Sequence, residues 1–412
     1  MKYNTHTLSD GLRVIHLPSA SPVIYCGYAV NAGTRDERPG EEGMAHFCEH
    51  ITFKGTSRRR AWHILNCLES VGGDLNAFTN KEDTVYHAAV LKEHVARAVD
   101  LLTDIVFHST YPQAEIEKEV GVICDEIESY NDSPAELVYD DFENVLFAGH
   151  PLGHNILGSE EQLRTYGHEH AQAFTRRYYR PANAVFFAYG DVDFDRLVRL
   201  LEKAERVPSD GISVDSVARE RSQTVMPAYT PGEHVRHMDT HLAHVMMGGR
   251  AYDVHDPRRM ALYLLNNILG GPGMNARLNV SLRERNALVY TVESTMVSYS
   301  DTGLWATYFG CDPKDERRCL RLVRRELDRV MSAPLTDSQL RAAKKQLKGQ
   351  IGVSCDSRES FALDFARGYL HYGWQRDVTS LLSRIDAVTA GEVLSVAREI
   401  FDPAVLTTYA IR

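Results

Sequence analysis

The sequence predicts an α+β protein of two homologous domains, each a mainly antiparallel sheet packed with long helices. With 412 residues, the chain can form two domains of roughly 200 residues, each with its own core. Pro181 and Pro403 both precede a strand pattern and are 222 residues apart, and Pro112 and Pro334 are separated by the same interval. Because the helix and strand patterns around these prolines also repeat, the chain indicates a divergent duplication.

The first half begins with strand patterns and continues with long helical patterns. We expect strands at 12–16 and 23–32, a helix around His46, strands through 77–91, helices at 93–107 and 115–130, and a strand at 184–189. Residues Tyr111 and Pro112 separate the last two helices.

The second half repeats this order after a polar stretch that opens with Pro208, Ser209, Asp210 and Gly211. We expect a strand at 244–249, a helix at 257–269, strands through 304–309, helices at 314–332 and 337–351, and a strand at 405–410. The predicted domains are therefore 1–207 and 230–412, joined by a linker at 208–229.

The composition is typical of a globular protein that does not bind nucleic acid. Apolar residues make up 43% of the chain and the mean hydropathy is −0.32. The net charge of −10 disfavours phosphate backbones as partners. No apolar run approaches the ~18 residues of a membrane span, and the first residues lack a signal-peptide core and an Arg-rich transit helix. We therefore expect a cytoplasmic protein without membrane contact, whose seven cysteines are reduced thiols.

The feature that carries chemistry is the segment from His46 to His50, which reads His-Phe-Cys-Glu-His. The two histidines are four residues apart, so on a helix they lie on one face and can bind the same metal ion. Glu49 lies beside them, close enough to act on a water at that metal. This HxxEH order is the inverzincin signature.

A zinc site of this kind needs a third protein ligand, which leaves one position for water. The helix predicted at 115–130 offers Glu119 and Glu126, two turns apart beside its apolar stripe. Their positions in the sequence do not show which of the two is the third ligand, and both could instead be solvent-exposed charges. His150 and His154 form another pair, but Pro151 and Gly153 between them predict a loop without a third ligand.

Only the first half of the duplication can build this site. The second-half helix that matches the motif, 258–267, contains no histidine pair. The segment that matches Glu126 reads Lys348-Gly349-Gln350. The second half must therefore contribute something else.

The motif and residues 51–56 resemble the active-site helix of the pitrilysin/insulinase family of zinc metallopeptidases, which includes the mitochondrial processing peptidases. Other matching segments, which extend the resemblance over nearly the whole chain, are Leu8–Val14, Gly72–Thr79, Tyr179–Asn183 and Leu282–Tyr290. In the family, the third ligand is a glutamate about 76 residues after the second histidine. The resemblance thus implies one Zn²⁺ per chain, held by His46, His50 and Glu126, with Glu119 as a supporting acid. Manganese or cobalt would also suit these ligands.

The resemblance also gives the second half a role. Arg283 and Tyr290 match an arginine–tyrosine pair of the family, and their side chains can donate hydrogen bonds to the oxyanion that forms when a peptide carbonyl is attacked. Arg277 and Arg285 compete as candidates by residue type, and all could be surface ion pairs. In longer members the pair comes from the half opposite the zinc. A clamshell-like homodimer is therefore implied, in which Arg283 and Tyr290 face the other subunit's zinc.

The segment after Gly72-Gly73 predicts a substrate-binding strand. The two glycines would end a helix and open an edge strand, whose backbone at Asn76, Ala77, Phe78 and Thr79 could pair with an extended peptide. The alternative is an ordinary interior strand. The family, in which such a strand lies beside the zinc, favours the first interpretation.

Together these inferences predict a zinc endopeptidase that hydrolyses unfolded or flexible peptides in an enclosed chamber. Zinc can lower the pKa of water from ~15.7 toward ~7, and Glu49 would take the proton and pass it to the leaving amine. Two alternatives are a non-catalytic scaffold and a subunit of a heterodimeric processing peptidase. The intact motif argues against the first, and Arg283 with Tyr290 argues against the second.

Overall fold

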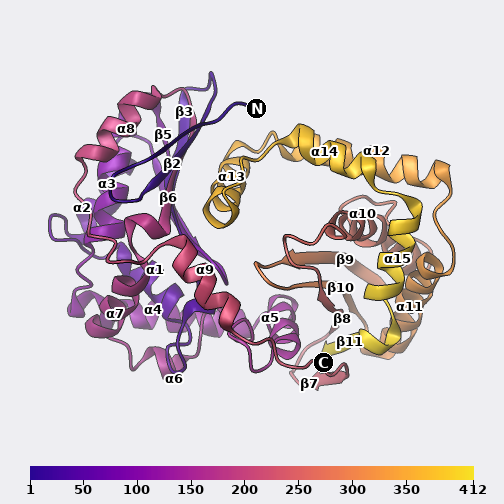
Figure 1. Ribbon diagram of the computed structural model, residues 1–412. Coiled ribbons are helices and arrows are strands. Elements are labelled where there is room, and N and C mark those ends of the chain that lie inside the picture. The colour runs from indigo at the N-terminus through magenta and orange to yellow at the C-terminus, as the bar shows by residue number, and fades with distance from the viewer. The chain divides into compact units, whose positions relative to one another are not determined.

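The computed structural model describes residues 1–412 and contains two compact units, each built on its own sheet (Figure 1). Unit 1 comprises Met1–Ser129, His154–Val225 and Cys355–Asp377. Unit 2 comprises Tyr130–Gly153, Met226–Ser354 and Val378–Arg412. Helices and strands are mixed throughout both units, so the predicted α+β class is confirmed.

The sheet of unit 1 has six strands in the order β1-β2-β6-β3-β5-β4. Their bounds are β1 Asn4–Thr7, β2 Arg13–Pro18, β6 Ala184–Gly190, β3 Val23–Val30, β5 Thr84–Leu91 and β4 Asp74–Thr79. Only β2 and β6 run parallel, and the other neighbours are antiparallel. Strand β4 lies at one edge of this sheet, as the Gly72-Gly73 break predicts.

Helices cover both faces of this sheet. On one face, the ring of Tyr28 contacts Phe107 of helix α3 (Val95–His108). On the other face, Phe187 of β6 contacts Phe365 of helix α13 (Arg358–Tyr372). Because both faces are covered, strand β6 reads Ala-Val-Phe-Phe-Ala-Tyr without polar alternation. Figure 1 shows α13 and α3 on opposite sides of the strands.

The other helices of unit 1 include α1 and α4, which carry the candidate site. Their bounds are α1 Met44–Thr52, α2 Ala61–Glu69, α4 Gln113–Asn131, α6 Glu160–Leu163, α7 His168–Tyr178, α8 Phe194–Lys203 and α9 Val214–Gln223. Helix α1 packs against α7 and also contacts β4. The motif helix and the helix predicted at 115–130 are thus both present, as α1 and α4.

The sheet of unit 2 has five strands in the order β7-β11-β8-β10-β9. Their bounds are β7 Glu233–Arg236, β11 Thr407–Ile411, β8 Ala243–Ala251, β10 Gly303–Cys311 and β9 Val289–Ser298. Strands β7 and β11 are parallel and the others antiparallel. This order and these directions match β2-β6-β3-β5-β4 of unit 1, as a duplication predicts.

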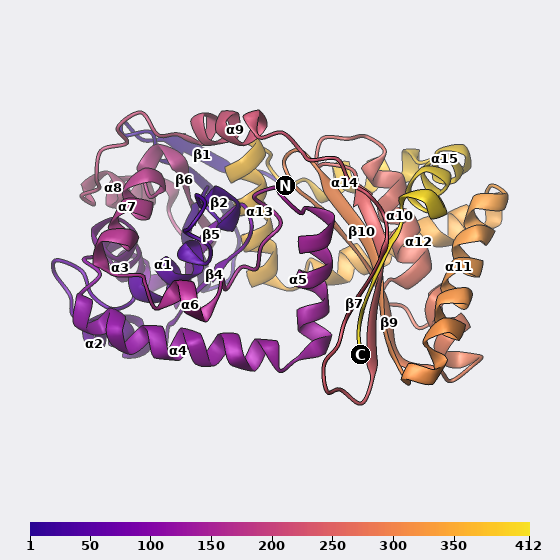
Figure 2. The same ribbon diagram turned by 90° about the horizontal axis from the view of Figure 1, so that it is seen from below.

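Helix α5 (Pro134–Leu146) packs against β8 and β11 of this second sheet. Figure 2 shows α5 alongside the strands of that sheet. The other helices of unit 2 are α10 Arg259–Gly270, α11 Glu316–Ser332, α12 Asp337–Ser354, α14 Val378–Ala387 and α15 Ala390–Ile400. No helix of the structure has both the length and the apolar character needed to cross a lipid bilayer. None of the seven cysteines is part of a disulfide.

The units differ from the continuous domains predicted at 1–207 and 230–412. Helix α5 comes from the first half of the sequence but belongs to unit 2, and α13 comes from the second half but belongs to unit 1. The segment predicted as a linker contains α9, whose buried Arg221 donates hydrogen bonds to Asp36 Oδ1 (2.8 Å) and Asn31 Oδ1 (3.0 Å). Sequence periodicity locates such helices but does not reveal the sheet on which each one packs.

A buried ion pair attaches α13 to the first sheet. Asp83 lies in the β4–β5 turn, is fully buried, and accepts hydrogen bonds from Arg367 Nε at 3.0 Å to both carboxylate oxygens. His371 Nε2 lies 2.9 Å from Asp83 Oδ2. Burial alone would raise the pKa of Asp83, but the Arg367 guanidinium and His371 hold it well below its usual range.

We predict that this carboxylate stabilises the protein at neutral pH and loses its effect in acid. The pKa of Asp83 is lower in the folded chain than the ~3.9 of an unfolded chain, so Asp83 adds to the free energy of unfolding at every pH above ~3.9. This stabilisation is lost as the pH falls from ~3.9 through the pKa of the folded chain. Asp83→Asn should lower the free energy of unfolding at pH 7 by roughly 2–3 kcal/mol. This is less than for a fully buried pair, because the Arg367 side chain is 41% exposed.

The measurement is the urea midpoint of wild type and variant between pH 7 and pH 3. The difference between the two midpoints should begin to shrink below pH ~4, where Asp83 of the unfolded chain takes up a proton, and should narrow further toward pH 3. Asp191→Asn removes an exposed partner of Lys92 and serves as the control, with little effect expected. Equal midpoints of wild type and Asp83→Asn at pH 7 would contradict the prediction.

Candidate metal centre

The motif helix α1 starts at a fixed point because a buried carboxylate binds its first turn. Gly43 precedes the helix with a φ of 87°, which suits glycine. Glu37 accepts hydrogen bonds from the backbone N–H of Gly43 (3.0 Å) and of Ala45 (2.7 Å). His154 Nε2 lies 2.8 Å from the same carboxylate. His154 thus contacts Glu37, in the loop that the sequence predicts, and burial raises the pKa of Glu37 to about 7.

The apolar side of α1 fixes its rotation. Phe47, Cys48 and Ile51 are fully buried in the core of unit 1. His46 and His50 project from the other side, toward α4, and their rings meet edge to face with centroids 4.6 Å apart. The four-residue spacing therefore brings both imidazoles to one place, as the sequence predicts.

Glu126 of α4 meets both imidazoles. The candidate ligand atoms of His46, His50 and Glu126 all lie within 4.8 Å of one another. Glu126 Oε1 is 3.8 Å from His46 Nε2, and Glu126 Oε2 is 3.3 Å from His50 Nε2. Atoms that ligate zinc at ~2.0–2.2 Å in a tetrahedron are separated by roughly 3.3–3.6 Å. Two imidazoles and one carboxylate are a donor set that suits zinc, and their ligand atoms lie close to these separations or somewhat farther apart.

Glu119 occupies a different position, one that supports a ligand. Its Oε1 lies 3.0 Å from Nδ1 of His50, on the side of the ring that faces away from Glu126. Its other oxygen is 2.5 Å from Lys54 Nζ. A carboxylate on the second nitrogen of a ligating histidine fixes the orientation of the ring. The geometry thus distinguishes two glutamates that position in the sequence left equivalent.

Lys54 forms an ion pair with Glu119 that the sequence did not predict. It follows His50 by four residues, just beyond the end of α1, so its spacing placed it on the same side as the motif. Burial raises the pKa of Glu119, but hydrogen bonds from His50 and Lys54 outweigh it and lower the pKa.

The charges around the imidazoles favour a cation. Burial and the neighbouring His50 lower the pKa of His46, which keeps this imidazole neutral and able to bind metal. Burial would also lower the pKa of His50, but hydrogen bonds to Glu119 and Glu126 raise it to about 9. Three carboxylates, of Glu49, Glu119 and Glu126, thus lie around two imidazoles. A divalent ion together with the Lys54 ammonium would balance their negative charge.

Glu49 lies outside the ligand cluster and contacts the edge strand. The hydroxyl of Thr79 on β4 donates a hydrogen bond of 2.5 Å to Glu49 Oε2. Burial raises the pKa of Glu49, and the Thr79 hydroxyl opposes this shift. The outer edge of β4 pairs with no other strand, and Asn76 on it is exposed. The motif carboxylate and the strand predicted to bind substrate therefore adjoin.

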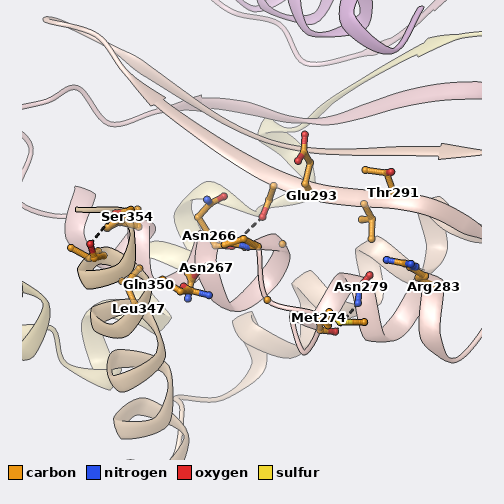
Figure 3. A pocket seen from close by; sticks show the side chains of 18 of the residues that line it. Asn266, Asn267, Met274, Asn279, Arg283, Thr291, Glu293, Leu347, Gln350 and Ser354 are labelled. Atoms are coloured by element: carbon orange, nitrogen blue, oxygen red, sulfur yellow. Dashed lines mark hydrogen bonds between the residues drawn. The ribbon is translucent and has the colours of Figure 1, made fainter. Parts of the chain in front are cut away.

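Arg283 and Tyr290 lie together in unit 2. Arg283 belongs to a π-helical turn (Asn279–Glu284), and its guanidinium carbon is 5.5 Å from the centroid of the Tyr290 ring. Both residues line a cavity of about 540 Å³, where Figure 3 shows Arg283 near Thr291 and Asn279. Tyr290 is 83% exposed. Arg277 and Arg285 instead line a different cavity, with Glu326.

Solved structures share this fold over the whole chain. A protease from Helicobacter pylori superimposes with a TM-score of 0.90 at 22% sequence identity, covering 100% of this chain and 99% of that one. A Pseudomonas fluorescens structure described as a peptidase M16 inactive domain gives a TM-score of 0.89 at 17% identity, covering 100% and 98%.

Sequence comparison identifies the family. Residues 14–160 match the insulinase domain (Peptidase family M16), and residues 167–347 match the Peptidase M16 inactive domain. A zinc protease of Streptomyces coelicolor is 34% identical over 96% of this chain and 86% of its own length. The zinc protease YmxG of Bacillus subtilis is 30% identical over 96% of this chain and 95% of its own length. Because these matches cover both halves of the chain, the protein belongs to the insulinase family of peptidases, family M16, in its short form.

Proposed function

We propose that this protein is a zinc-dependent endopeptidase that hydrolyses unfolded or flexible peptides. The observation that carries the proposal is the cluster of His46, His50 and Glu126, with ligand atoms within 4.8 Å and with Glu49 beside it. Membership of a peptidase family whose relatives are described as zinc proteases supports it.

His46, His50 and Glu126 would hold the zinc ion, which supplies a Lewis acid that activates water. Glu49 is the proton carrier: its carboxylate accepts a proton from the attacking water and then gives it to the leaving amine. General acid–base catalysis of this kind typically increases the reaction rate by ~10²–10⁴-fold. The Thr79 hydroxyl orients the carboxylate of Glu49 for this task. Glu119 and Lys54 keep the ring of His50 in place.

Substrate binds, in this proposal, as an added strand on β4. The unpaired edge of β4 offers backbone N–H and C=O groups from alternate residues of the segment Asn76, Ala77, Phe78 and Thr79. Strand pairing of this kind requires an extended segment of the substrate. It depends on hydrogen bonds to the substrate backbone more than on contacts with its side chains. Unfolded or flexible peptides meet that requirement, whereas segments within folded domains do not.

Arg283 and Tyr290 complete the proposal as donors to the oxyanion of the attacked carbonyl. Their mutual contact and the exposure of Tyr290 support this role, since the phenol is available to a ligand. In the proposed homodimer, the pair of one subunit serves the zinc of the other, and the subunits enclose the substrate in a chamber.

The first test is hydrolysis of quenched, unstructured peptides by the full-length protein with and without chelator. We expect chelator-sensitive cleavage that falls by at least ~10²-fold in Glu49→Gln, because the proton carrier is lost. Zinc content, measured by elemental analysis, should stay at one per chain. Glu128→Gln, at an exposed position of α4, is the control. If zinc-loaded wild type cleaves none of these peptides, the scaffold alternative is favoured.

Glu119→Gln should weaken zinc binding by roughly 10–100-fold, because His50 loses the carboxylate that orients it. The affinity can be measured by competition with a chromogenic chelator. Glu117→Gln changes an exposed carboxylate two residues away on the same helix and should leave the affinity unchanged. Equal affinities of the two variants would show that Glu119 does not support the ligand.

Mixing two inactive variants tests whether the site is shared. A dimer of one Glu49→Gln subunit and one Arg283→Ala subunit contains one intact site if the arginine acts across the interface. Random exchange should then restore about a quarter of the wild-type activity, since half the dimers are mixed and each has one intact site. Stable mixed dimers that stay inactive would refute sharing and leave the metal assignment intact.

A further inference from the structure

Arg180 is an almost buried cation whose Nε has no hydrogen-bond partner. It follows helix α7 in unit 1, and its side chain is 13% exposed. Its Nε is itself buried. Asp210 Oδ2 lies 3.7 Å from Arg180 Nη2, beyond hydrogen-bond range, and the Asp210 side chain is 65% exposed. A guanidinium has five N–H donors, and burying its charge without a paired anion is costly.

This guanidinium borders a cavity of about 260 Å³ that contains a second arginine. The lining residues are Val106, Phe107, Ser109, Tyr111, Gln172, Thr175, Arg176, Tyr179, Arg180 and Val207. Arg176 donates a hydrogen bond of 2.9 Å to Gln172 Oε1, a neutral acceptor. The lining thus contains two cations and no carboxylate. Its volume corresponds to several water molecules at ~30 Å³ each, enough for a small anion.

The cavity adjoins the far end of the motif helix without including the metal ligands. Tyr179 lines it, and the Tyr179 hydroxyl is 2.9 Å from the hydroxyl of Tyr86. Tyr86 in turn donates to Thr52 Oγ1 (3.3 Å), and Ser109 of the lining donates to the carbonyl of Thr52 (2.9 Å). Thr52 is the last residue of α1. An occupant would therefore contact the groups that fix this end of α1.

We propose that the cavity binds a small oxyanion, a carboxylate or a phosphate, through Arg176 and Arg180. The planar fork of a guanidinium matches two oxygens of either group. An anion here would accept a hydrogen bond from the buried Arg180 Nε and offset the cost of burying the guanidinium. Val106, Phe107 and Val207 line the cavity with apolar groups. They would contact the hydrocarbon part of an organic carboxylate but offer nothing to a free phosphate, so probes of the two kinds can be distinguished. The site is independent of the proposed peptidase function.

The test uses full-length, zinc-loaded protein with inorganic phosphate or benzoate as probes, at ionic strength matched with sodium chloride. Binding should raise the heat-unfolding midpoint by a few degrees at about 100 times Kd. Arg180→Gln should abolish the rise. Arg199→Gln, an exposed residue on α8 outside the cavity, should retain it. If Arg180→Gln does not fold, Arg176→Gln, at an exposed position, should weaken binding by about tenfold in calorimetric titration.

Each outcome decides the proposal. A rise with benzoate alone assigns the site to carboxylates, and a rise with phosphate alone assigns it to phosphates. No rise with either probe, or an equal rise in Arg180→Gln, overturns the proposal. A rise that survives in Arg180→Gln but disappears in His46→Ala would place the anion at the metal centre and overturn it as well.

Discussion

The contact between His50 and Glu119 is the interaction on which the candidate metal centre depends. It joins α1 to α4, two helices far apart in the sequence, through a 3.0 Å contact that Lys54 reinforces. Once this contact sets the position of α4, Glu126, two turns along the helix, reaches the face shared by both imidazoles. The ligand set is therefore a consequence of how two helices are held together.

The other end of α1 is fixed by a second buried carboxylate. Glu37 satisfies backbone N–H groups of the first turn and is itself contacted by His154. Buried charges of this kind are stable only when they are paired and hydrogen-bonded. Arg180 satisfies this rule less well, because its buried Nε has no hydrogen-bond partner and its nearest carboxylate, that of Asp210, is exposed and 3.7 Å away. In unit 1, Glu37 is thus paired within the fold, whereas Arg180 has a donor left for the oxyanion that we propose.

The two units use one topology for different purposes. Both sheets share a strand order in which one pair is parallel and the last hairpin forms an edge. In unit 1 that edge, β4, touches Glu49 through Thr79. In unit 2 the equivalent edge, β9, carries Tyr290 beside Arg283. The two units therefore share a framework, while the candidate metal ligands are present in unit 1 only.

The sequence by itself determined the elements and the local geometry of the motif. A four-residue spacing on a helix puts His46 and His50 on one face, and a pair of glycines opens β4 as an edge strand, because both features follow from backbone geometry within a few residues. Only the tertiary structure decided that Glu119 contacts Nδ1 of His50 while Glu126 meets both imidazoles, that α5 and α13 pack in opposite units, and that the Arg180 Nε has no hydrogen-bond partner. These outcomes depend on contacts between segments far apart in the chain. Periodicity shows which face of a helix is apolar, but it does not show which surface that face will meet.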